Sequence, residues 1–345
     1  MKQIALALIL LSVAPARAQE VRVPSFTLPA SNQLSADAML VLERMKATVA
    51  PPEIVGDVAR QRAFYQTYND DRLADMRRHF RTSERHEIVD GVAVDIVEPA
   101  AGIAPRNRSR VLINVHGGAF MWGAGSGGLV EAIPIAATMG IKVVTVDYRL
   151  APEHRYPAAS EDVAAVYRAL QKKYPAGNIG IYGCSAGGVI TAQATAWIRR
   201  QRLPRPGAIG TFCGTGAAYS GDSPYLAGPI TGGASLAAPT LPPTLTTSYL
   251  AGVPANDAYA YPLLSDTQTG AMPPTLLLAG GRDFAASTLT LAHRRLARLG
   301  VESELYLFDG LPHAFFVWPD MPESTEAYAL IGRFFDRHLG RRMRR

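Results

Sequence analysis

The segment Gly183-Cys184-Ser185-Ala186-Gly187 carries the strongest chemical signal in this chain. It fits the pattern G-x-S-x-G, in which a sharp turn from a strand into a helix exposes a serine hydroxyl at the edge of a sheet. Residues 178–182 before it are short and β-prone, and residues 188–194 after it open an Ala-rich helical run. Glycine suits both ends of the motif because a side chain there would crowd so tight a turn. The motif therefore predicts a nucleophilic serine at Ser185.

A serine is a weak nucleophile until a base removes its proton and a third group orients that base. In enzymes that use this turn, an acid and then a histidine follow the serine along the chain, each just after a strand. Asp283 follows the apolar run 275–279, and His313 follows the run 304–308. Both residues therefore fall where this order requires an acid and a histidine.

Other acids and histidines fit the order less well. Asp309 lies close to His313 in sequence, which disfavours it as the partner, although chain order alone leaves it open. Asp266 precedes its strand and would lie at the opposite edge of the sheet. His293 and His338 lie within charged helical patterns and are expected at the surface.

Acyl transfer also needs backbone amides that bind the developing oxyanion, and losing one such donor costs about 100- to 1,000-fold in rate. One amide belongs to Ala186, and others are expected in the loop after the strand 111–115. That loop reads His116-Gly117-Gly118-Ala119-Phe120, and its small residues let the backbone approach a substrate carbonyl. His116 is a lone histidine without metal-ligand spacing, so we interpret it as a residue that shapes the loop by hydrogen bonding.

The elements that must position these residues form an alternating pattern of strands and helices. Strands are expected at 86–89, 92–97, 111–115, 142–146, 178–182, 208–213, 275–279 and 304–308, and helices near 156–174, 186–201, 286–299 and 324–339. Asp90-Gly91 is a hairpin turn signal between the first two strands. The pattern predicts an α/β fold with a mostly parallel eight-stranded sheet and helices on both faces.

The N-terminus carries a separate signal. Residues 1–18 combine Lys2, an apolar stretch and the A-x-A site Ala16-Arg17-Ala18, which predicts a cleaved signal peptide and a secreted or periplasmic protein. The apolar stretch is too short to span a bilayer, so no stable membrane insertion is expected after cleavage, with an uncleaved anchor as the alternative. The net charge is +6, and much of it lies in the arginines of 341–345. A terminal basic run without interleaved aromatics predicts no nucleic-acid partner.

Two further segments fall outside the alternating pattern. Residues 19–82 show helical patterning without strand alternation, and Ser35 is a candidate helix cap, so we expect a helical cap there. Residues 216–262 are rich in Gly, Pro, Ser and Thr. A structureless loop of that length is unusual in a compact domain, so we expect it to form a second cap element over the site. The catalytic domain is then expected over 83–345.

The two cysteines of the chain, Cys184 and Cys213, do not make a disulfide framework. Cys213 ends a predicted strand that should neighbour the strand carrying Cys184. A bridge between them is one hypothesis, and two buried, inert thiols are the other.

Taken together, these motifs resemble the hormone-sensitive-lipase-like group of α/β-hydrolases. The matching segments run in order over about residues 85–340 and are His116-Gly117-Gly118-Ala119-Phe120, Asp147-Tyr148-Arg149-Leu150-Ala151-Pro152-Glu153-His154, Tyr156-Pro157-Ala158-Ala159-Ser160-Glu161-Asp162, Gly183-Cys184-Ser185-Ala186-Gly187-Gly188, Asp283, and His313-Ala314-Phe315. The resemblance implies an α/β-hydrolase fold. It also implies Ser185 as nucleophile, His313 as base and acid, and Asp283 as the orienting carboxylate, with no cofactor and no metal.

The resemblance further implies that the amides of Gly118, Ala119 and Ala186 bind the oxyanion, with Gly117 supporting the loop. Three positions depart from the pattern of this group. Ala119 stands where a third glycine is usual, and Cys184 replaces the acidic residue or threonine that usually precedes the serine. After Asp283 the chain reads Phe284-Ala285-Ala286-Ser287, where relatives often show a leucine and a second aspartate.

The activity implied is hydrolysis of a small-molecule carboxylic ester, with a short acyl chain, through an acyl-enzyme. Phe120, Met121 and Trp122 follow the oxyanion loop and are candidate acyl-pocket residues, with packing beneath the cap as the alternative. Carbohydrate deacetylation and amide hydrolysis use the same triad, and some relatives of this group only bind small molecules. These readings stay open, as does a homodimeric assembly.

Overall fold

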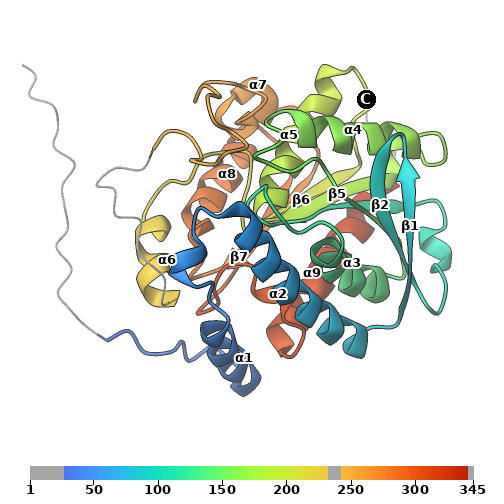
Figure 1. Cartoon of the computed structure of the whole chain (residues 1–345). Helices are drawn as coiled ribbons and strands as arrows, with labels where there is room; N and C mark the ends of the chain where they lie inside the picture. The colour runs from blue at the N-terminus through green and yellow to red at the C-terminus, as the bar shows by residue number, and fades with distance from the viewer. Residues whose placement is uncertain (1–26, 232–241, 341–345) are drawn as a thin grey trace, which may run out of the picture.

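The computed structural model describes residues 27–231 and 242–340 and is built on one eight-stranded sheet (Figure 1). The strands are β1 (Thr82–Val89), β2 (Val92–Pro99), β3 (Val111–Val115), β4 (Lys142–Val146), β5 (Ile179–Cys184), β6 (Ala208–Phe212), β7 (Thr275–Gly280) and β8 (Ser303–Phe308). They lie in the order β1-β2-β4-β3-β5-β6-β7-β8. The β1–β2 and β2–β4 pairs are antiparallel and all other pairs are parallel. The expected mostly parallel sheet is confirmed.

The turn at Asp90-Gly91 joins β1 to β2. Asp90 has a φ of 50° and Gly91 a φ of 82°, and Val89 pairs directly with Val92. Two consecutive positive φ values are what a two-residue hairpin requires, and Asp-Gly is a sequence that adopts them readily.

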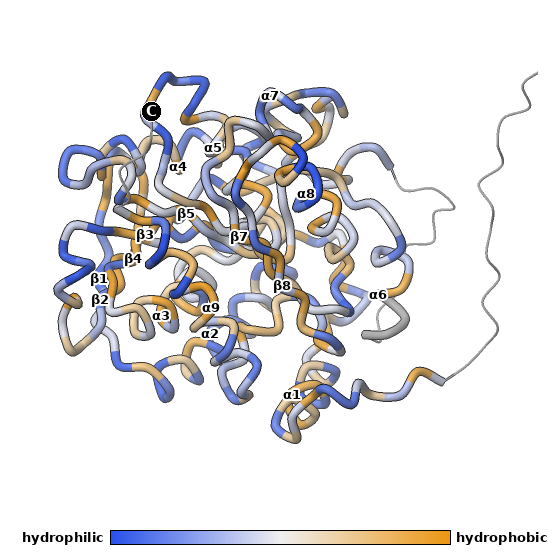
Figure 2. The backbone as a smooth tube through the Cα atoms, turned by 180° about the vertical axis from the view of Figure 1, so that it is seen from behind, coloured by the Kyte–Doolittle hydropathy of each residue, from blue (hydrophilic) through white to orange (hydrophobic). Residues whose placement is uncertain are grey.

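Helices cover both faces of the sheet. The α-helices are α1 (Ala36–Ala47), α2 (Val58–His79), α3 (Ser126–Met139), α4 (Ala158–Leu170), α5 (Ala186–Arg200), α6 (Ser223–Thr231), α7 (Asp266–Thr269), α8 (Ala286–Arg298) and α9 (Pro322–His338), with short 3-10 turns at Pro52–Ile54, Pro105–Asn107, Ala176–Asn178, Pro262–Leu264 and Phe315–Val317. The helices α4, α5 and α8 pack on one face, and α3 and α9 pack on the other. Figure 2 shows the apolar colour concentrated in the strands and in the helix sides that face them.

Strand β3 illustrates why the sheet is buried on both faces. Val111, Ile113 and Val115 belong to the core beneath α4, α5 and α8, whereas Leu112 belongs to the core beneath α3 and α9. Because successive side chains point to opposite faces, a strand covered by helices on both sides is apolar on both faces. The polar residue of β3, Asn114, is buried with hydrogen bonds to Glu131 and Thr145. β3 therefore lies at the centre of the molecule, next to β5.

The helix α3 was not expected from the sequence. It begins with Ser126-Gly127-Gly128 and contains Pro134, residues that disfavour a helix interior. Tertiary burial overrides that preference, because nearly every residue of α3 is buried between the sheet, α2 and α9. The glycines also permit close contact: a Cβ at Gly128 would lie 2.4 Å from Thr145 Oγ1 on β4.

The segment before the sheet forms two helices, as expected. Ser35 caps α1, its side chain accepting a hydrogen bond from the Ala38 amide. Helix α2 packs along α3, and Leu73 and Met76 of α2 belong to the same core as α9. In Figure 1, α2 lies in front of the sheet and α1 lies below it, at the lower edge of the molecule. The predicted signal peptide, 1–18, lies outside the described residues.

The Gly- and Pro-rich stretch 216–262 is described over 216–231 and 242–262. Its described residues include α6, which contacts α8, and Leu245, Tyr249 and Tyr261, which join the core with α4 and α5. The Tyr249 carbonyl accepts a hydrogen bond from the Tyr156 amide, 2.9 Å away. This stretch thus contributes to the core on the α5 side of the sheet.

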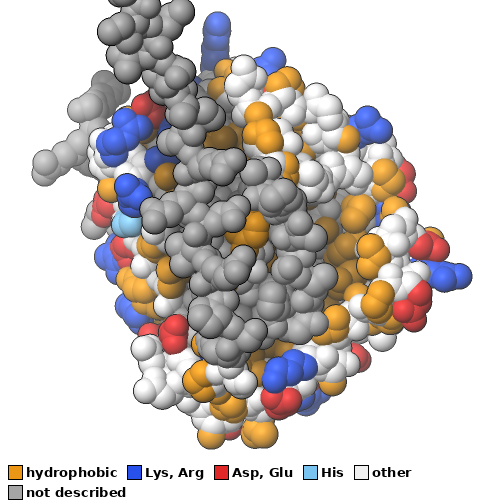
Figure 3. Space-filling view, turned by 90° about the vertical axis from the view of Figure 1, so that its left-hand side faces the viewer, with side chains coloured by type: hydrophobic (Ala, Val, Ile, Leu, Met, Phe, Trp, Pro, Cys, Tyr) orange, Lys and Arg blue, Asp and Glu red, His pale blue; other side chains and the backbone are white. Residues whose placement is uncertain are grey.

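On the face seen in Figure 3, the described residues that are visible show basic, acidic and apolar side chains interspersed. Within the described ranges, no helix combines the length and the hydropathy that a membrane span needs.

Candidate active site

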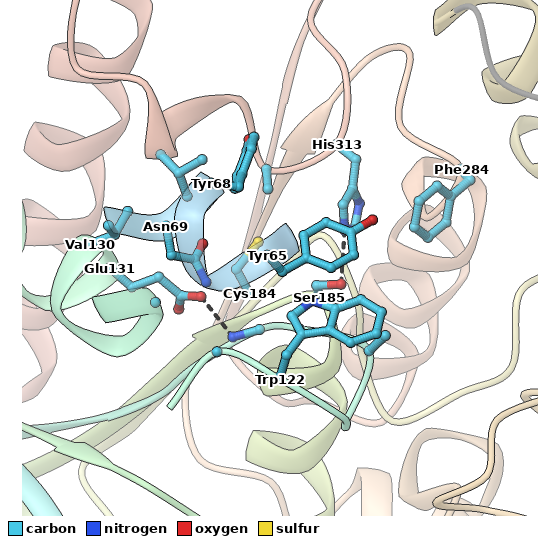
Figure 4. Close-up of a pocket in the computed structure, with 17 residues that line it drawn as sticks. Tyr65, Tyr68, Asn69, Trp122, Val130, Glu131, Cys184, Ser185, Phe284 and His313 are labelled. Carbon is cyan, nitrogen blue, oxygen red and sulfur yellow. Dashed lines mark hydrogen bonds between the residues drawn. The ribbon is translucent and has the colours of Figure 1, made fainter. Parts of the chain in front are cut away.

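Ser185 lies at the turn from β5 into α5, at the carboxyl end of the central strands (Figure 4). Its φ of 57° and ψ of −123° lie in a region that residues with a side chain rarely adopt. Steric contact with the backbone of β3 explains why Gly183 and Gly187 flank this turn. A Cβ at Gly183 would lie 2.1 Å from the carbonyl oxygen of Val115, and a Cβ at Gly187 would lie 1.8 Å from the same atom. The backbone of β3 therefore passes directly against the turn and allows only glycine at both positions.

This contact makes a prediction for Gly183→Ala. The added methyl group meets backbone atoms of Val115 and Gly187, which no side-chain rotation can clear, so we expect the free energy of unfolding to fall by about 3 kcal/mol. Gly332→Ala in α9 is the matched control, since its nearest neighbour is the flexible Met139 side chain at 3.1 Å. Urea unfolding followed by circular dichroism measures both. Equal, small effects in the two variants would contradict this account of the turn.

The structure brings Ser185, His313 and Asp283 into one hydrogen-bonded row. Asp283 follows β7 and His313 follows β8. His313 Nε2 lies 2.9 Å from Ser185 Oγ, and His313 Nδ1 lies 2.9 Å from Asp283 Oδ1. Asp283 is fully buried and also accepts a hydrogen bond from the Ala285 amide at 2.8 Å. The His313 ring stacks on Phe284, with 4.2 Å between ring centroids, so it is held from the side as well as at both nitrogens.

The other acids and histidines take different positions. The Asp309 carboxylate accepts a hydrogen bond from the Ser31 hydroxyl, so the acid that contacts His313 is Asp283. His293 is partly buried, and its Nδ1 lies 2.9 Å from Ser303 Oγ. His338 was expected at the surface, and this was wrong: it is 4% exposed. It lies on the inner face of α9, where its ring contacts Phe334.

The loop after β3 has an unusual backbone. Gly118, Ala119 and Phe120 have φ values of 113°, 50° and 66°. The Met121 and Trp122 amides both donate to the Gly118 carbonyl, at 2.8 and 3.0 Å, which closes the loop on itself. A glycine would adopt the Ala119 conformation without strain, so Ala119 costs about 1 kcal/mol at this position. Within 27–231 and 242–340, no hydrogen-bond acceptor is found for the amides of Gly118, Ala119 and Ala186.

The loop is held from below by Glu131, a residue that the sequence analysis missed. The Gly117 amide donates to Glu131 Oε1 at 2.8 Å, and Asn114 Nδ2 donates to Oε2 at 3.0 Å. On the other side, His116 Nδ1 lies 2.7 Å from the Gly117 carbonyl oxygen, a loop-shaping contact of the expected kind. The sequence feature that could have indicated Glu131 is that it is an acidic residue inside the otherwise apolar run 129–133.

Glu131 is 8% exposed, and its surroundings disfavour its charge. Burial raises the pKa of its carboxyl from 4.5 to about 7, although the Gly117 amide and Asn114 oppose the shift by donating to it. No Lys or Arg in the described part of the chain forms an ion pair with it. Burial likewise lowers the pKa of His116.

The raised pKa predicts how stability depends on pH. A carboxyl whose folded-state pKa is raised contributes stability below its unfolded pKa and loses it as pH rises toward the folded value. Between pH 4.5 and about 7, ionisation of Glu131 should therefore cost up to about 3 kcal/mol. The Glu131→Gln variant cannot ionise at this position. The difference in unfolding free energy between the variant and the wild type should therefore change in favour of the variant as the pH rises through this range. Denaturant titrations at several pH values measure this, and a difference that is constant with pH would contradict the burial argument.

A cavity of about 370 Å³ opens at Ser185 and His313. Its floor is the oxyanion loop with Glu131, and α2 contributes its roof through Tyr65, Tyr68 and Asn69 (Figure 4). Trp122 stacks on Tyr65, with 4.3 Å between centroids and 8° between planes, and this stack closes one side.

The three candidate pocket residues separate in the structure. Trp122 lines the cavity, whereas Phe120 and Met121 do not. Phe120 is buried and stacks on Tyr249, with 4.8 Å between centroids, because its positive φ turns the side chain under the loop into the core. The described residues of 216–262 also do not line the cavity, so the roof comes from the N-terminal cap alone among the described residues.

A second, open groove of about 520 Å³ begins at the far side of His313. It is lined mainly by apolar residues of α1 and its flanks, among them Met39, Leu42, Met45 and Val49. Tyr65 and Tyr68 border both the groove and the cavity. His313 likewise borders both spaces.

The two cysteines are free, buried thiols, so the hypothesis of a bridge between them has no support in the structure. Burial raises the pKa of the Cys213 thiol to about 11, which leaves it protonated and unreactive near neutral pH. Cys213 also has its sulfur close to Asp283 and His313, the three ligand atoms lying within 4.8 Å of one another, and His86, Asp95 and Asp147 form a similar group near β2. Both groups have metal-ligating atoms, but their hydrogen bonds already account for their positions.

Comparisons with known proteins agree with this fold. A family described as having the alpha/beta hydrolase fold matches residues 112–317. An acetyl-hydrolase of Streptomyces hygroscopicus is 26% identical over 242 residues, which cover 66% of this chain and 76% of the relative. A crystal structure of an esterase, E25, superposes with a TM-score of 0.77 at 28% identity and covers 93% of this chain and 99% of that one. An esterase from the bacterial hormone-sensitive lipase family gives a TM-score of 0.76 at 25% identity, with 89% and 99% covered.

Proposed function

The chain belongs to the alpha/beta hydrolase fold family and is a hormone-sensitive-lipase-like carboxylic-ester hydrolase, and from this premise we propose that Ser185 carries out the reaction through an acyl-enzyme. The observation that supports this assignment is the row of two 2.9 Å hydrogen bonds from Ser185 through His313 to Asp283. The Ser185 hydroxyl lies within hydrogen-bond distance of its base, His313, and the buried Asp283 carboxylate orients that base.

In acylation, Ser185 Oγ attacks the ester carbonyl carbon while its proton passes to His313 Nε2. The negative charge that develops on the carbonyl oxygen is bound by the amides of Gly118, Ala119 and Ala186. The C–O bond to the alcohol then breaks, and His313 returns the proton to the leaving oxygen. Water repeats the sequence on the acyl-enzyme and releases the acid. Asp283 accepts the hydrogen bond of His313 Nδ1 and so orients the imidazolium that forms twice per cycle.

This mechanism predicts a non-additive mutant pattern. Ser185→Ala and His313→Ala should each lower kcat by about 10⁴-fold or more, and the double variant should be little worse, since the groups act as a unit. Steady-state hydrolysis of p-nitrophenyl acetate measures all three. Multiplicative losses in the double variant would contradict a shared step.

The size of the cavity supports a short acyl chain. The acyl group must lie next to Ser185 and the oxyanion loop, and the 370 Å³ cavity is the space that contacts both. The stack of Trp122 on Tyr65 limits its length. The name of the Streptomyces relative, an acetyl-hydrolase, also refers to a small acyl group, and it makes deacetylation the second candidate activity.

A Trp122→Ala variant tests this limit. Removing the indole opens the cavity, so the ratio of kcat/KM for octanoate over acetate p-nitrophenyl esters should rise about tenfold. Trp197→Ala is the matched control because Trp197 packs against Tyr156 and Tyr259, away from the cavity. An equal change of the ratio in both variants would show that Trp122 does not set chain length.

The alcohol part of the ester should leave on the side of His313, because that imidazole protonates it. The open groove beside α1 begins there and gives the alcohol an apolar path to solvent. We further propose that the enzyme is exported, on the signal-peptide pattern of residues 1–18. Protease protection of the protein in intact cells tests this separately from activity.

A further inference from the structure

Glu131 is a buried carboxylate beside the catalytic row, and the mechanism above does not use it. It reaches the site from α3, and its carboxylate points at the Gly117 amide (Figure 4). Both of its side-chain partners, the Gly117 amide and Asn114 Nδ2, are donors. An ionised carboxylate only accepts hydrogen bonds, so this arrangement fits the charged form.

Gly117 connects Glu131 to the reacting serine. A Cβ at Gly117 would lie 3.3 Å from Glu131 Oε1 and 3.4 Å from the Ser185 Cβ. The Gly117 backbone is therefore held between the carboxylate and the nucleophile, and the donor amides of Gly118 and Ala119 follow directly along the chain. A shift of Gly117 must move those amides relative to Ser185.

The carboxylate is itself fixed by a buried chain of polar groups. Thr145 Oγ1 donates to Asn114 Oδ1 at 2.7 Å, and the Asn114 amide group donates to Glu131. Tyr182 anchors the backbone of the same helical turn by donating to the Glu131 carbonyl oxygen at 3.2 Å. These contacts connect β3, β4, β5 and α3, so the position of Glu131 is set by the most buried part of the sheet.

Cys184, the residue before the serine, supplies no charge at this site, because burial raises the pKa of its thiol and keeps it neutral. The titratable groups that interact with Glu131 from the packed elements are Tyr148, Tyr182, Cys184 and His313. Of these, His313 is the one that takes up a proton during the proposed cycle.

We propose that Glu131, in its ionised form, is a positioning residue of this active site, which fixes the oxyanion loop by accepting the hydrogen bond of the Gly117 amide. The proposal rests on the role of His313 as the base. Its consequence is that the enzyme needs Glu131 ionised as well as His313 neutral before substrate binds. Protonation of either group then lowers kcat/KM on the acid side.

Glu131→Gln separates the charge from the packing. Glutamine keeps the volume and an acceptor toward Gly117, and rotation of the Asn114 amide can accommodate its NH₂ group. We expect kcat to fall about tenfold with KM within about twofold, a smaller loss than that of a whole oxyanion donor. The acid limb of kcat/KM should change from a two-proton to a one-proton dependence. Thermal unfolding at pH 8 should be no easier than in the wild type, because a buried charge has been removed.

Three further proteins complete the experiment. Glu326→Gln removes the same charge from an exposed position on α9 and should leave kcat and the pH profile unchanged. Glu131→Asp keeps the charge but shortens the side chain, so kcat should fall while the two-proton limb remains. Ser185→Ala, assayed in parallel, tests the proposed function independently: activity that survives it would overturn the triad and not only the role of Glu131.

The inference is overturned if the wild type itself shows a one-proton acid limb, a result that needs no variant to fold. It is also overturned if Glu131→Gln has wild-type kcat and pH profile. If activity falls only in proportion to folded protein, with easier unfolding at pH 8, Glu131 is a structural residue and the proposal fails.

Discussion

The close passage of the Val115 carbonyl past the turn that carries Ser185 is the constraint on which the rest of the site depends. It requires glycine on both sides of the serine and leaves the nucleophile in a strained backbone conformation. Such strain persists only where the surroundings fix the chain. Here the surroundings are β3 and β5, the two central parallel strands, covered by helices on both faces. The deep burial of the sheet is thus what allows one side chain to be presented so rigidly at its edge.

The same two strands place the other parts of the site. β3 continues into the loop 117–119, which lines the cavity beside Ser185, and the loops after β7 and β8 deliver Asp283 and His313 to the same edge. Parallel strands make this convergence automatic, because all their carboxyl ends lie on one side. The spaces above this edge are bordered by other elements. The roof of the cavity comes from α2, and the open groove comes from α1, so the N-terminal segment shapes the space in which the ester must fit.

Much of this could be predicted from the sequence, for physical reasons that differ by element. Strands buried on both faces read as short apolar runs, and Asp90-Gly91 fixed the hairpin because few residues accept two positive φ values. The chain order of Ser185, Asp283 and His313 carries information because each residue ends or follows a strand. Local patterns did not predict α3, because its glycines and its proline disfavour a helix, whereas burial in the folded protein stabilises one. Glu131 was missed for that reason, since a residue on an unexpected helix has no expected neighbour. The prediction for His338 was wrong, and Phe120 was left open between pocket and core packing, because the directions of both side chains depend on backbone angles and packing that periodicity does not report.

The central claim is that the reaction passes through a covalent ester on Ser185. Mixing the mature enzyme with p-nitrophenyl acetate, quenching in acid and digesting it for mass spectrometry tests this directly. The account predicts a single acetyl group on the peptide that contains Ser185, formed in a burst and absent when His313 is replaced by alanine. An acetyl group on another residue, or turnover without any acylated peptide, would contradict it.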